Sequence, residues 1–533
     1  MFSNKLKNDI GIKQMLFAGF VGVSCINGAY AQKNEKPNII FVISDDLRPE
    51  LNCYGQSHMK TPVLDGLAQN GVTFTNAFVQ QAICAASRAS FLTGCRPDVT
   101  GVDYPYSEYF VKEFMPEHPS IQAYMHKNGY YVRNFGKVHH GLNEDHSEPH
   151  FLAKSVHKLY ATKKNIDIAH DRSLAPPFEC ADVPDDKYAD GVIANEVIKT
   201  IRKVGKNEDQ PFFLTVGFYK PHLPFCAPKK YWDLYNRDSI PLSQNPKPAI
   251  GSPKYATTDQ ALKKWNGESD ANGHIVSQER SRLLKHAYFA CVSYVDTQVG
   301  RIISELKEQN LYENTIIVFV SDHGWHLGDH GMWGKATNFE RATRAPLIVR
   351  FPSSQQNGVK CDKLVEYVDL FPSLVDFAGI EIPEYLEGTS FSPLLKDPER
   401  KWKKAAFSQY PRGKKEGYSI RTERYRYTEW RNKEEGIVAR ELYDHFNDSN
   451  ETVNIVTDNE VLAKSLSQQL KMGWKKALPD GVINVSDNPV APVAVPWHRS
   501  KEKFGKRKKN RKNKKDVVSS YGPLHDLMEE ARL

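Results

Sequence analysis

Residues 38–44 read Asn-Ile-Ile-Phe-Val-Ile-Ser, and Asp45 and Asp46 follow them directly. The middle of this stretch is apolar and largely β-branched, with no polar alternation, which is typical of a strand buried on both faces. Strands of this kind occur in parallel sheets that are covered by helices on both sides. The stretch therefore predicts an α/β fold and places two carboxylates at the end of one of its strands.

The alternation of short apolar runs with helical patterns continues to about residue 396. The other apolar runs that predict strands are residues 130–135, 212–218 and 315–320. Helical spacing is present between them, as in residues 62–70, which end before Gly71, and in residues 281–308. This order predicts a large mixed, mostly parallel sheet with helices on both faces, in which ligands bind beyond the carboxyl ends of the strands.

Residues capable of chemistry follow each of the four predicted strands. Besides Asp45 and Asp46, the segments concerned are Gly136-Lys137-Val138-His139-His140, Lys220-Pro221-His222 and Ser321-Asp322-His323-Gly324. Any one of them could be an ordinary loop, but parallel strands bring their carboxyl ends to one edge of the sheet. We therefore expect the four segments to form one site.

The composition excludes several classes of protein. The chain has 533 residues, of which 40% are hydrophobic and 11% aromatic, so it is neither a disordered scaffold nor a polytopic membrane protein. The net charge of +8 is concentrated in residues 501–515, where ten Lys or Arg and one Glu give +9. Because the rest of the chain is near neutral, we expect no nucleic-acid partner.

The N-terminal residues predict an export signal. Three lysines within the first 13 residues precede an apolar run over residues 15–23, and Ala29-Tyr30-Ala31 supplies the small residues of a cleavage site before Gln32. The apolar run is shorter than the roughly 20 residues of a membrane-spanning helix. We therefore expect a periplasmic or secreted protein with no transmembrane segment in the mature chain.

These patterns divide the chain into four parts. They are a signal peptide at residues 1–31, a catalytic domain at 32–395, a smaller C-terminal subdomain with a short antiparallel sheet at 396–488, and a basic tail at 489–533. Strands of the small sheet are expected within residues 418–430 and 441–443, and a helix at 460–477. The tail has little apolar content and is expected to be disordered on its own.

Three carboxylates at strand ends, Asp45, Asp46 and Asp322, would repel one another if they gathered without a cation. An adjacent pair of aspartates after a strand is often only a turn or a helix cap. A second strand that ends in Asp322 and His323 favours a metal site instead. Oxygen-rich ligation suits a hard divalent cation such as Ca²⁺ or Mg²⁺, which His323 could also bind.

Basic side chains are expected to face this cluster, namely Arg88, Lys137 and Lys335. Each preorganised donor aimed at a developing oxyanion is worth roughly 3–4 kcal/mol. A lone lysine is most often a solvated surface residue, but Lys137 and Lys335 follow motifs at strand ends. A divalent cation with fixed positive charges around one pocket predicts a site for a sulfate or phosphate ester.

The segment Cys84-Ala-Ala-Ser-Arg88, closed by Leu92-Thr93-Gly94, resembles the signature of the type I formylglycine-dependent sulfatases, a family of the alkaline-phosphatase-like superfamily. Ala86 stands where the family usually has Pro. Other segments similar to the family are Pro37–Asp46, Thr61–Asp65, Ser321–Gly328 with Lys335, and Glu441–Asp444. Within the family, Ser321–Gly328 and Lys220–Phe225 most resemble iduronate 2-sulfatase and its bacterial relatives.

The resemblance implies a role for each site residue. It implies that a maturation enzyme oxidises Cys84 to formylglycine (3-oxoalanine), whose hydrate is the nucleophile. It implies that the metal, Ca²⁺ in preference to Mg²⁺, is held by Asp45, Asp46, Asp322, His323 and the converted Cys84. It further implies that Arg88 orients the hydrate, that Lys137 and Lys335 neutralise the transferring group, and that His222 protonates the leaving oxygen.

The family pattern leaves two histidines open for the proton released by the hydrate. The iduronate type has Lys-x-x-His, which selects His140 after Lys137. Many other sulfatases have Lys-x-His, which selects His139. His140 fits the subgroup better, and His139 stays a candidate.

The resemblance implies an exported sulfatase that hydrolyses sulfate esters of glycosaminoglycan-type sugars, in particular the 2-O-sulfate of a uronic acid. Two alternatives are also hydrolases: a sulfatase for another position on a carbohydrate, and a phosphoester or phosphonate hydrolase. A third is a non-catalytic protein that binds polyanions through residues 501–515. The remaining cysteines show no C-x-x-C zinc spacing, and the sequence does not give their disulfide pairing.

Overall fold

The computed structural model describes residues 36–102, 118–140, 150–151, 159–206, 210–258, 261–265, 276–352, 357–486 and 488. All of them belong to one unit of the chain, Lys36–Leu533. The predicted signal peptide and basic tail lie outside the described residues. Among the residues described, no helix has both the length and the apolar composition needed to cross a membrane.

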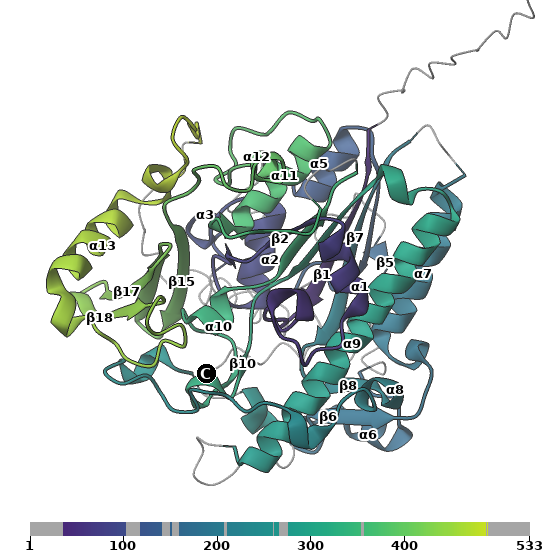
Figure 1. The fold of residues 1–533 in the computed structure, drawn as a ribbon, viewed down its shortest axis with the longest axis horizontal. Helices are drawn as coiled ribbons and strands as arrows, with labels where there is room; N and C mark the ends of the chain where they lie inside the picture. Colours follow the sequence, from purple (N-terminus) through teal and green to yellow (C-terminus); the bar gives the residue numbers. More distant parts are fainter. Residues whose placement is uncertain are drawn as a thin grey trace, which may run out of the picture. The chain divides into compact units, whose positions relative to one another are not determined.

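An eight-stranded sheet forms the centre of this unit (Figure 1). Its strands, in spatial order, are β13 (Val359–Cys361), β2 (Val72–Phe74), β12 (Leu347–Arg350), β9 (Thr315–Ser321), β1 (Asn38–Asp45), β7 (Phe212–Pro221), β4 (Tyr131–Gly136) and β5 (His150–Phe151). The run β9-β1-β7-β4-β5 is parallel throughout, and β12 is antiparallel to both of its neighbours. The predicted mixed, mostly parallel sheet is therefore confirmed.

Alternate residues of β1 face two different cores. Ile40 and Val42 belong to a core with α1 (Pro62–Gln69), α7 (Ala189–Val204) and α9 (Gln278–Glu308). Ile39, Phe41 and Ile43 belong to a second core with α2 (Cys84–Thr93), α5 (Ile121–Lys127) and α11 (Leu370–Phe377). Successive side chains of a strand point to opposite faces, so the apolar run of β1 is explained by helices on both sides of the sheet (Figure 1).

The boundaries of the predicted elements differ from the structure by a few residues. The difference that affects the predicted site is in β7, which continues three residues beyond the predicted end at Phe218, to Pro221. Lys220 and Pro221 therefore lie in the strand, and only His222 follows it. Asp190 fixes this extension, because its carboxylate accepts hydrogen bonds from the backbone N–H groups of Tyr219 (2.8 Å) and Lys220 (3.0 Å).

A second sheet of four antiparallel strands lies C-terminally, as predicted. Its strands are β15 (Ala406–Arg412), β16 (Lys415–Arg421), β17 (Tyr425–Asn432) and β18 (Gly436–Asp444). Helix α13 (Glu460–Met472) packs on it through Leu466 and Leu470. The prediction of one helix over 460–477 is wrong in its last turn, because Gly473 adopts φ 74° and a separate 3-10 turn, η12 (Trp474–Ala477), follows.

The remaining elements are short. Two-stranded sheets pair β3 (Ala77–Phe78) with β14 (Val365–Glu366), β6 (Phe178–Ala181) with β8 (Phe225–Pro228), and β10 (His326–Leu327) with β11 (Trp333–Gly334). The short α-helices are α3 (Pro97–Thr100), α6 (Lys163–Ile168), α8 (Lys229–Trp232), α10 (Glu340–Thr343) and α12 (Ser392–Lys396). The short 3-10 helices are η1 (Asn52–Tyr54), η4 (Asp185–Lys187), η5 (Arg237–Ser239), η6 (Lys254–Ala256), η7 (Ala261–Lys264), η8 (Tyr312–Asn314), η9 (Asp329–Gly331), η10 (Tyr367–Asp369) and η11 (Thr457–Asn459).

A buried ion network joins the small sheet to the main body. Arg96 donates two hydrogen bonds to the carboxylate of Glu366, at 2.7 and 2.9 Å, and Lys403 bridges Glu366 (2.9 Å) and Asp369 (2.7 Å). The backbone N–H of Phe407, in β15, donates to the same Glu366 carboxylate at 2.9 Å. Glu366 is therefore the common acceptor of the network, and its loss would leave two buried cations without their shared partner.

We expect Glu366→Gln to lower the free energy of unfolding at pH 7. Burial alone would raise the pKa of Glu366, but Arg96 and Lys403 outweigh it and hold the pKa at about 2, below the ordinary 4.5. This stabilisation is present above pH 4.5 and is lost as the pH falls toward 2. The shift corresponds to about 3 kcal/mol. Denaturant unfolding at pH 7 and pH 3 measures it, and an equal loss at both values would contradict the expectation.

Glu313→Gln is the matched control for this variant. The Glu313 side chain is 84% exposed and pairs with Arg350 at 2.7 Å. Exposed ion pairs contribute at most about 1 kcal/mol. The control should therefore unfold almost as the parent protein does at both pH values.

Candidate active site

The carboxyl ends of three neighbouring strands meet at one point. Ser44 of β1 pairs with Ser321 of β9, and Asp45 pairs with Pro221 of β7. The residues that follow these ends are Asp46, Asp322 with His323, and His222. The parallel register therefore brings together the side chains that the sequence predicted to meet.

The turn after β4 joins them because of two glycines. Gly136 has φ 67°, and a Cβ placed on Gly217 of the adjacent β7 would lie 1.9 Å from the carbonyl oxygen of Lys137. A side chain at Gly217 would therefore push the Lys137 backbone away. With glycine there, Lys137 turns over the end of the sheet, and its carbonyl accepts a hydrogen bond from Arg88 Nη1.

Cys84 lies at the centre of the predicted residues. It is the first residue of α2, and its Sγ lies 3.1 Å from Lys335 Nζ and 3.7 Å from Lys137 Nζ. Asp45 Oδ1 and His323 Nε2 are each 3.4 Å from the same sulfur. Burial, with Asp45 nearby, raises the pKa of the Cys84 thiol well above its usual value. The unmodified thiol is therefore a poor nucleophile at neutral pH.

Arg88 follows Cys84 by one helical turn, so both side chains leave the same side of α2. Its Nε donates to Asp322 Oδ2 at 3.0 Å, and its Nη1 also donates to the carbonyl of Val138 at 3.2 Å. The guanidinium is fully buried. Arg88 therefore links the end of β9 to the turn after β4 and holds a positive charge in the neighbourhood of Cys84.

Four of the predicted metal ligands form a tight cluster. Ligand atoms of Asp45, Asp46, Cys84 and His323 all lie within 4.8 Å of one another and are buried. Asp322 adjoins them, because its Oδ1 accepts a hydrogen bond from the backbone N–H of Asp46 at 3.0 Å and lies 3.6 Å from His323 Nε2. The structure therefore brings all five predicted ligands to one place.

The chemistry of this cluster fits a hard divalent cation. Burial raises the pKa of Asp46 well above its usual value, and the carboxylates of Asp45 and Asp322 raise it further although Lys335 opposes them. Asp46 Oδ2 is buried and accepts no hydrogen bond from the residues that the structure describes. Burial also lowers the pKa of His323 to about 4, which keeps its imidazole neutral. Carboxylate oxygens with one neutral imidazole are a suitable donor set for Ca²⁺ or Mg²⁺.

The ammonium groups of two lysines neutralise the charge of the carboxylates. Lys137 Nζ donates to Asp45 Oδ2, and Lys335 Nζ donates to Asp46 Oδ1 at 2.6 Å. Both side chains are 12% exposed, so both are partly accessible to solvent. With Arg88, the three cations match the three aspartates, and the positive charges surround the Cys84 sulfur.

The three candidate histidines differ in their surroundings. His222 Nε2 lies 3.7 Å from Asp46 Oδ2, while its Nδ1 lies 2.6 Å from the carbonyl oxygen of Leu223. Burial, together with Lys137 and Lys335, lowers the pKa of His140 to about 3. His139 is partly buried in the same turn. The charges of Lys137 and Lys335 therefore act directly on the His140 imidazole.

The sequence did not reveal the residues that brace Asp46. Asp46 adopts φ 65°, a left-handed conformation that is uncommon for residues other than glycine. The hydroxyl of Tyr288 donates to the carbonyl of Asp46 (2.8 Å) and accepts from the N–H of Arg48 (3.2 Å), and Ser321 Oγ accepts from the N–H of Leu47 (2.8 Å). Tyr288 lies within a long amphipathic helix, where an aromatic residue is indistinguishable from ordinary core.

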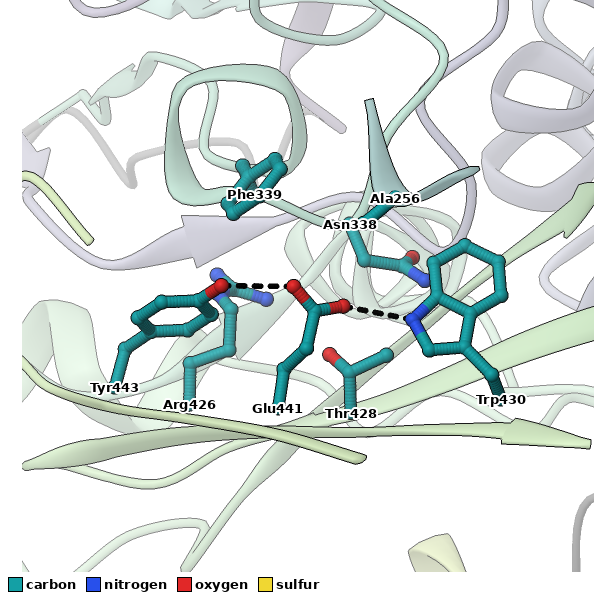
Figure 2. Close-up of a pocket in the computed structure, with 8 residues that line it drawn as sticks. All are labelled: Ala256, Asn338, Phe339, Arg426, Thr428, Trp430, Glu441 and Tyr443. Carbon is teal, nitrogen blue, oxygen red and sulfur yellow. Dashed lines mark hydrogen bonds between the residues drawn. The ribbon is translucent and has the colours of Figure 1, made fainter. Parts of the chain in front are cut away.

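A small cavity lies elsewhere, between the C-terminal sheet and residues 338–339 (Figure 2). Figure 2 shows Glu441 between Tyr443 and Trp430, whose hydroxyl and indole N–H donate to its carboxylate at 2.7 Å each. None of the predicted site residues lines this cavity. Its polar side chains are engaged within the fold, since Glu441 binds Tyr443 and Trp430 while Asn338 donates to the carbonyl of Gly417 and Arg426 pairs with Glu340, so we assign the cavity to the packing of the sheet.

One more cluster has the residue types of a metal site but not its chemistry. Glu340, His445 and Glu451 lie close together. Arg426 already bridges Glu340 (2.6 Å) and Glu451 (2.9 Å), and Arg421 also pairs with Glu340 (3.0 Å). Two guanidinium groups therefore neutralise these carboxylates. The seven cysteines among the described residues, Cys84 included, are free thiols.

Comparison with known proteins gives matches over most of the chain. A family model described as Sulfatase matches residues 37–380, and a model described as N-sulphoglucosamine sulphohydrolase, C-terminal, matches residues 328–476. Iduronate 2-sulfatase of Mus musculus is 34% identical over 497 residues, covering 78% of this chain and 90% of that protein.

Two solved structures show the same fold. One is a protein in complex with its substrate D-glucosamine-2-N,6-O-disulfate, with 23% identity, a TM-score of 0.67, and coverage of 84% of this chain and all of the other. The second is the phosphonate monoester hydrolase of Agrobacterium radiobacter, with 24% identity, a TM-score of 0.66, and coverage of 81% and 94%. At these identities the likeness establishes the shared fold.

Proposed function

Because this chain belongs to the sulfatase family and is a sulfuric ester hydrolase, we propose that it removes the 2-O-sulfate of a uronic acid in a glycosaminoglycan-type sugar. One observation carries the proposal: the sulfur of Cys84 lies within 3.7 Å of two lysine ammonium groups, above a buried carboxylate cluster. The 34% identity to mouse iduronate 2-sulfatase, in an alignment that covers 90% of that protein, supports the proposed position of the sulfate.

The nucleophile and the metal belong to this proposal. Formylglycine made from Cys84 by a maturation enzyme would supply a hydrated aldehyde whose hydroxyl attacks sulfur. Asp45, Asp46, Asp322 and His323, with the converted Cys84, would hold Ca²⁺, which supplies positive charge to the sulfate oxygens. Arg88, fixed on Asp322 at 3.0 Å, keeps the residue at position 84 oriented at the start of α2.

Lys137 and Lys335 bind the sulfate group in this proposal. Both ammonium groups face the Cys84 sulfur, and both are held by carboxylates, so little reorganisation is needed when an anion enters. The first backbone N–H groups of α2 point toward the same anion. Positive charge is therefore in place before the sulfur–oxygen bond breaks.

Two histidines move protons in this proposal. His222 protonates the leaving sugar oxygen from Nε2, because its Nδ1 is held by the Leu223 carbonyl and its Nε2 lies on the side of Asp46, 3.7 Å from Oδ2. His140 would accept the proton of the second hydroxyl at position 84 as sulfate is expelled and the aldehyde re-forms, because it is the histidine of the Lys-x-x-His pattern that begins at Lys137. His139, which is partly buried in the same turn, is the alternative acceptor.

Export and maturation complete the proposal. Residues 1–31 would direct the chain to the periplasm or the medium, where sulfated glycans are met, and a formylglycine-generating enzyme would act on Cys84. We also propose that residues 32–395 form the catalytic domain, that residues 396–488 form the C-terminal subdomain, and that residues 489–533 are a tail that is not needed for turnover of small substrates.

Sulfate release from a panel of disaccharides tests the function. The panel carries single sulfates at the uronate 2-position or at the hexosamine 6-, 4- or N-position, and the protein is produced together with a maturation enzyme. We expect release from the 2-sulfated uronate alone. Release from a hexosamine position would overturn the proposed substrate and keep the chemistry. Turnover of phosphonate monoesters without any sulfate release, after mass spectrometry has found formylglycine at position 84, would favour the other hydrolase class.

A further inference from the structure

The loop that carries Lys335 has a strained backbone. It runs from β11 to α10, and Ala336, directly after Lys335, adopts φ 57°. The left-handed region costs an L-residue roughly 1–2 kcal/mol. A loop with such a residue keeps its shape only if its surroundings hold it.

Several hydrogen bonds hold the residues after Lys335, and two of them join this loop to the C-terminal sheet. The N–H of Ala336 donates to Ala82 (3.0 Å), two residues before Cys84, and Thr337 Oγ1 lies 3.0 Å from His326 Nε2. From the sheet, Arg412 Nη2 donates to the carbonyl of Ala336, and Asn338 Nδ2 donates to the carbonyl of Gly417 (2.9 Å). The hairpin of β15 and β16 is therefore hydrogen-bonded to the loop just after Lys335.

Arg412 is itself rigidly placed at the end of β15. Its Nε donates to the carbonyl of Tyr255 at 3.0 Å, its Nη1 donates to the carbonyl of Pro411 at 3.2 Å, and its guanidinium lies 4.4 Å from the ring centre of Tyr410. All three nitrogens are thus in use, two of them on segments other than β15. A planar guanidinium can make these bonds at once, whereas a lysine ammonium cannot match their directions.

We propose that Arg412 is a positioning residue for Lys335, so that the C-terminal sheet completes the active site. The inference rests on the role proposed for Lys335. Lys335 Nζ reaches both Asp46 Oδ1 (2.6 Å) and Cys84 Sγ (3.1 Å), and both distances depend on the path of residues 335–338. Removing the Arg412 bond frees the carbonyl of the strained residue next to Lys335.

Hydrogen exchange measured by mass spectrometry tests the inference without any turnover. In Arg412→Met the amides of residues 332–340 should exchange faster than in the parent protein, while those of β9 stay protected. Arg424→Met is the matched control, since Arg424 follows the opposite end of β16 and pairs with Asp444 at 2.8 and 2.7 Å with a 42% exposed side chain. Unchanged exchange in 332–340, or faster exchange throughout the unit, would overturn the proposal.

A double-mutant cycle tests whether Arg412 acts through Lys335. The assay is initial-rate sulfate release from the substrate that the parent enzyme cleaves. We expect Lys335→Met to lower kcat about 10³-fold. Arg412→Met should lower kcat about 10²-fold with little change in KM. The double variant should fall no further than Lys335→Met alone. Additive losses would show that Arg412 acts elsewhere and would overturn the inference.

Two further results keep this inference separate from the proposed function. If Lys335→Met is fully active, Lys335 does not have the proposed role, and Arg412 cannot then be a positioning residue for it. This conclusion holds for any substrate that the enzyme cleaves. Asn338→Ala removes the second bond to the sheet, at Gly417, and must show the same local exchange and the same lack of additivity. It also replaces Arg412→Met in both tests if that variant does not fold.

Discussion

Cys84→Ala is expected to abolish sulfate release, with kcat falling by at least about 10⁵-fold, as when the nucleophile of a hydrolase is removed. Cys84 Sγ lies 3.1 Å from Lys335 Nζ, and alanine leaves nothing there to be oxidised or to attack. Lys137, Arg88 and the carboxylates keep their own contacts in this variant. We therefore expect it to bind the sulfated sugar while failing to cleave it, which calorimetry and a sulfate assay on one preparation would show.

Cys291→Ala is the control for this variant. Cys291 is buried in α9, and burial raises the pKa of its thiol to about 12, so it is an inert core residue outside the site. The control should retain full activity with slightly lower stability. Measurable turnover by Cys84→Ala, at more than about 1% of the parent rate, would contradict the assignment of the nucleophile.

The second large effect is expected from loss of the metal. Treatment with a chelator should abolish activity, and Ca²⁺ should restore it. Asp46→Asn should lower activity about 10³-fold at ordinary calcium concentrations, because it removes one charge from the ligand set. It also places a neutral amide 2.6 Å from Lys335, where a carboxylate lies in the parent protein. Full activity after exhaustive removal of divalent cations would contradict the metal site.

Calcium titration separates the role of Asp46 from a general loss of stability. Asp296→Asn is the matched control, because Asp296 is also a buried aspartate but accepts from the backbone N–H groups of Val63 and Leu64 at the start of α1. In calorimetry, Asp46→Asn should bind Ca²⁺ much more weakly, whereas Asp296→Asn should bind it as the parent does. Equal calcium affinity in both variants would show that Asp46 is not a ligand.

The central strands and the site they carry could be predicted from the sequence because both depend on local patterns. Residues 38–44 are apolar on both faces, and β1 indeed contributes Ile40 to one core and Phe41 to the other. The convergence of Asp46 with Asp322 follows from the parallel register alone, since Ser44 pairs with Ser321. The apolar pattern of each strand, which depends only on neighbours in sequence, thus predicted which side chains lie at the same edge of the main sheet.

Other features could not be predicted because they depend on contacts between distant segments. The antiparallel β12 has four residues, too few for a pattern to give its direction. The left-handed backbone of Asp46 is held by Tyr288, and nothing in a helix of 31 residues marks one tyrosine as different from the others. The contact of Arg412 with Ala336 spans 76 positions, and an arginine at a hairpin turn is by itself typical of a solvated surface.

The hydrogen bonds between the hairpin and the loop after Lys335 also limit which recombined genes can encode an active enzyme. Residues 335–338 and 412–417 are in contact, although about 75 positions separate them, so substitutions in one segment change the fit of the other. A crossover between two homologous genes that falls between these segments would join a loop to a foreign hairpin. Productive crossovers should therefore fall before Lys335 or after Gly417, and the two segments should diverge together among related genes.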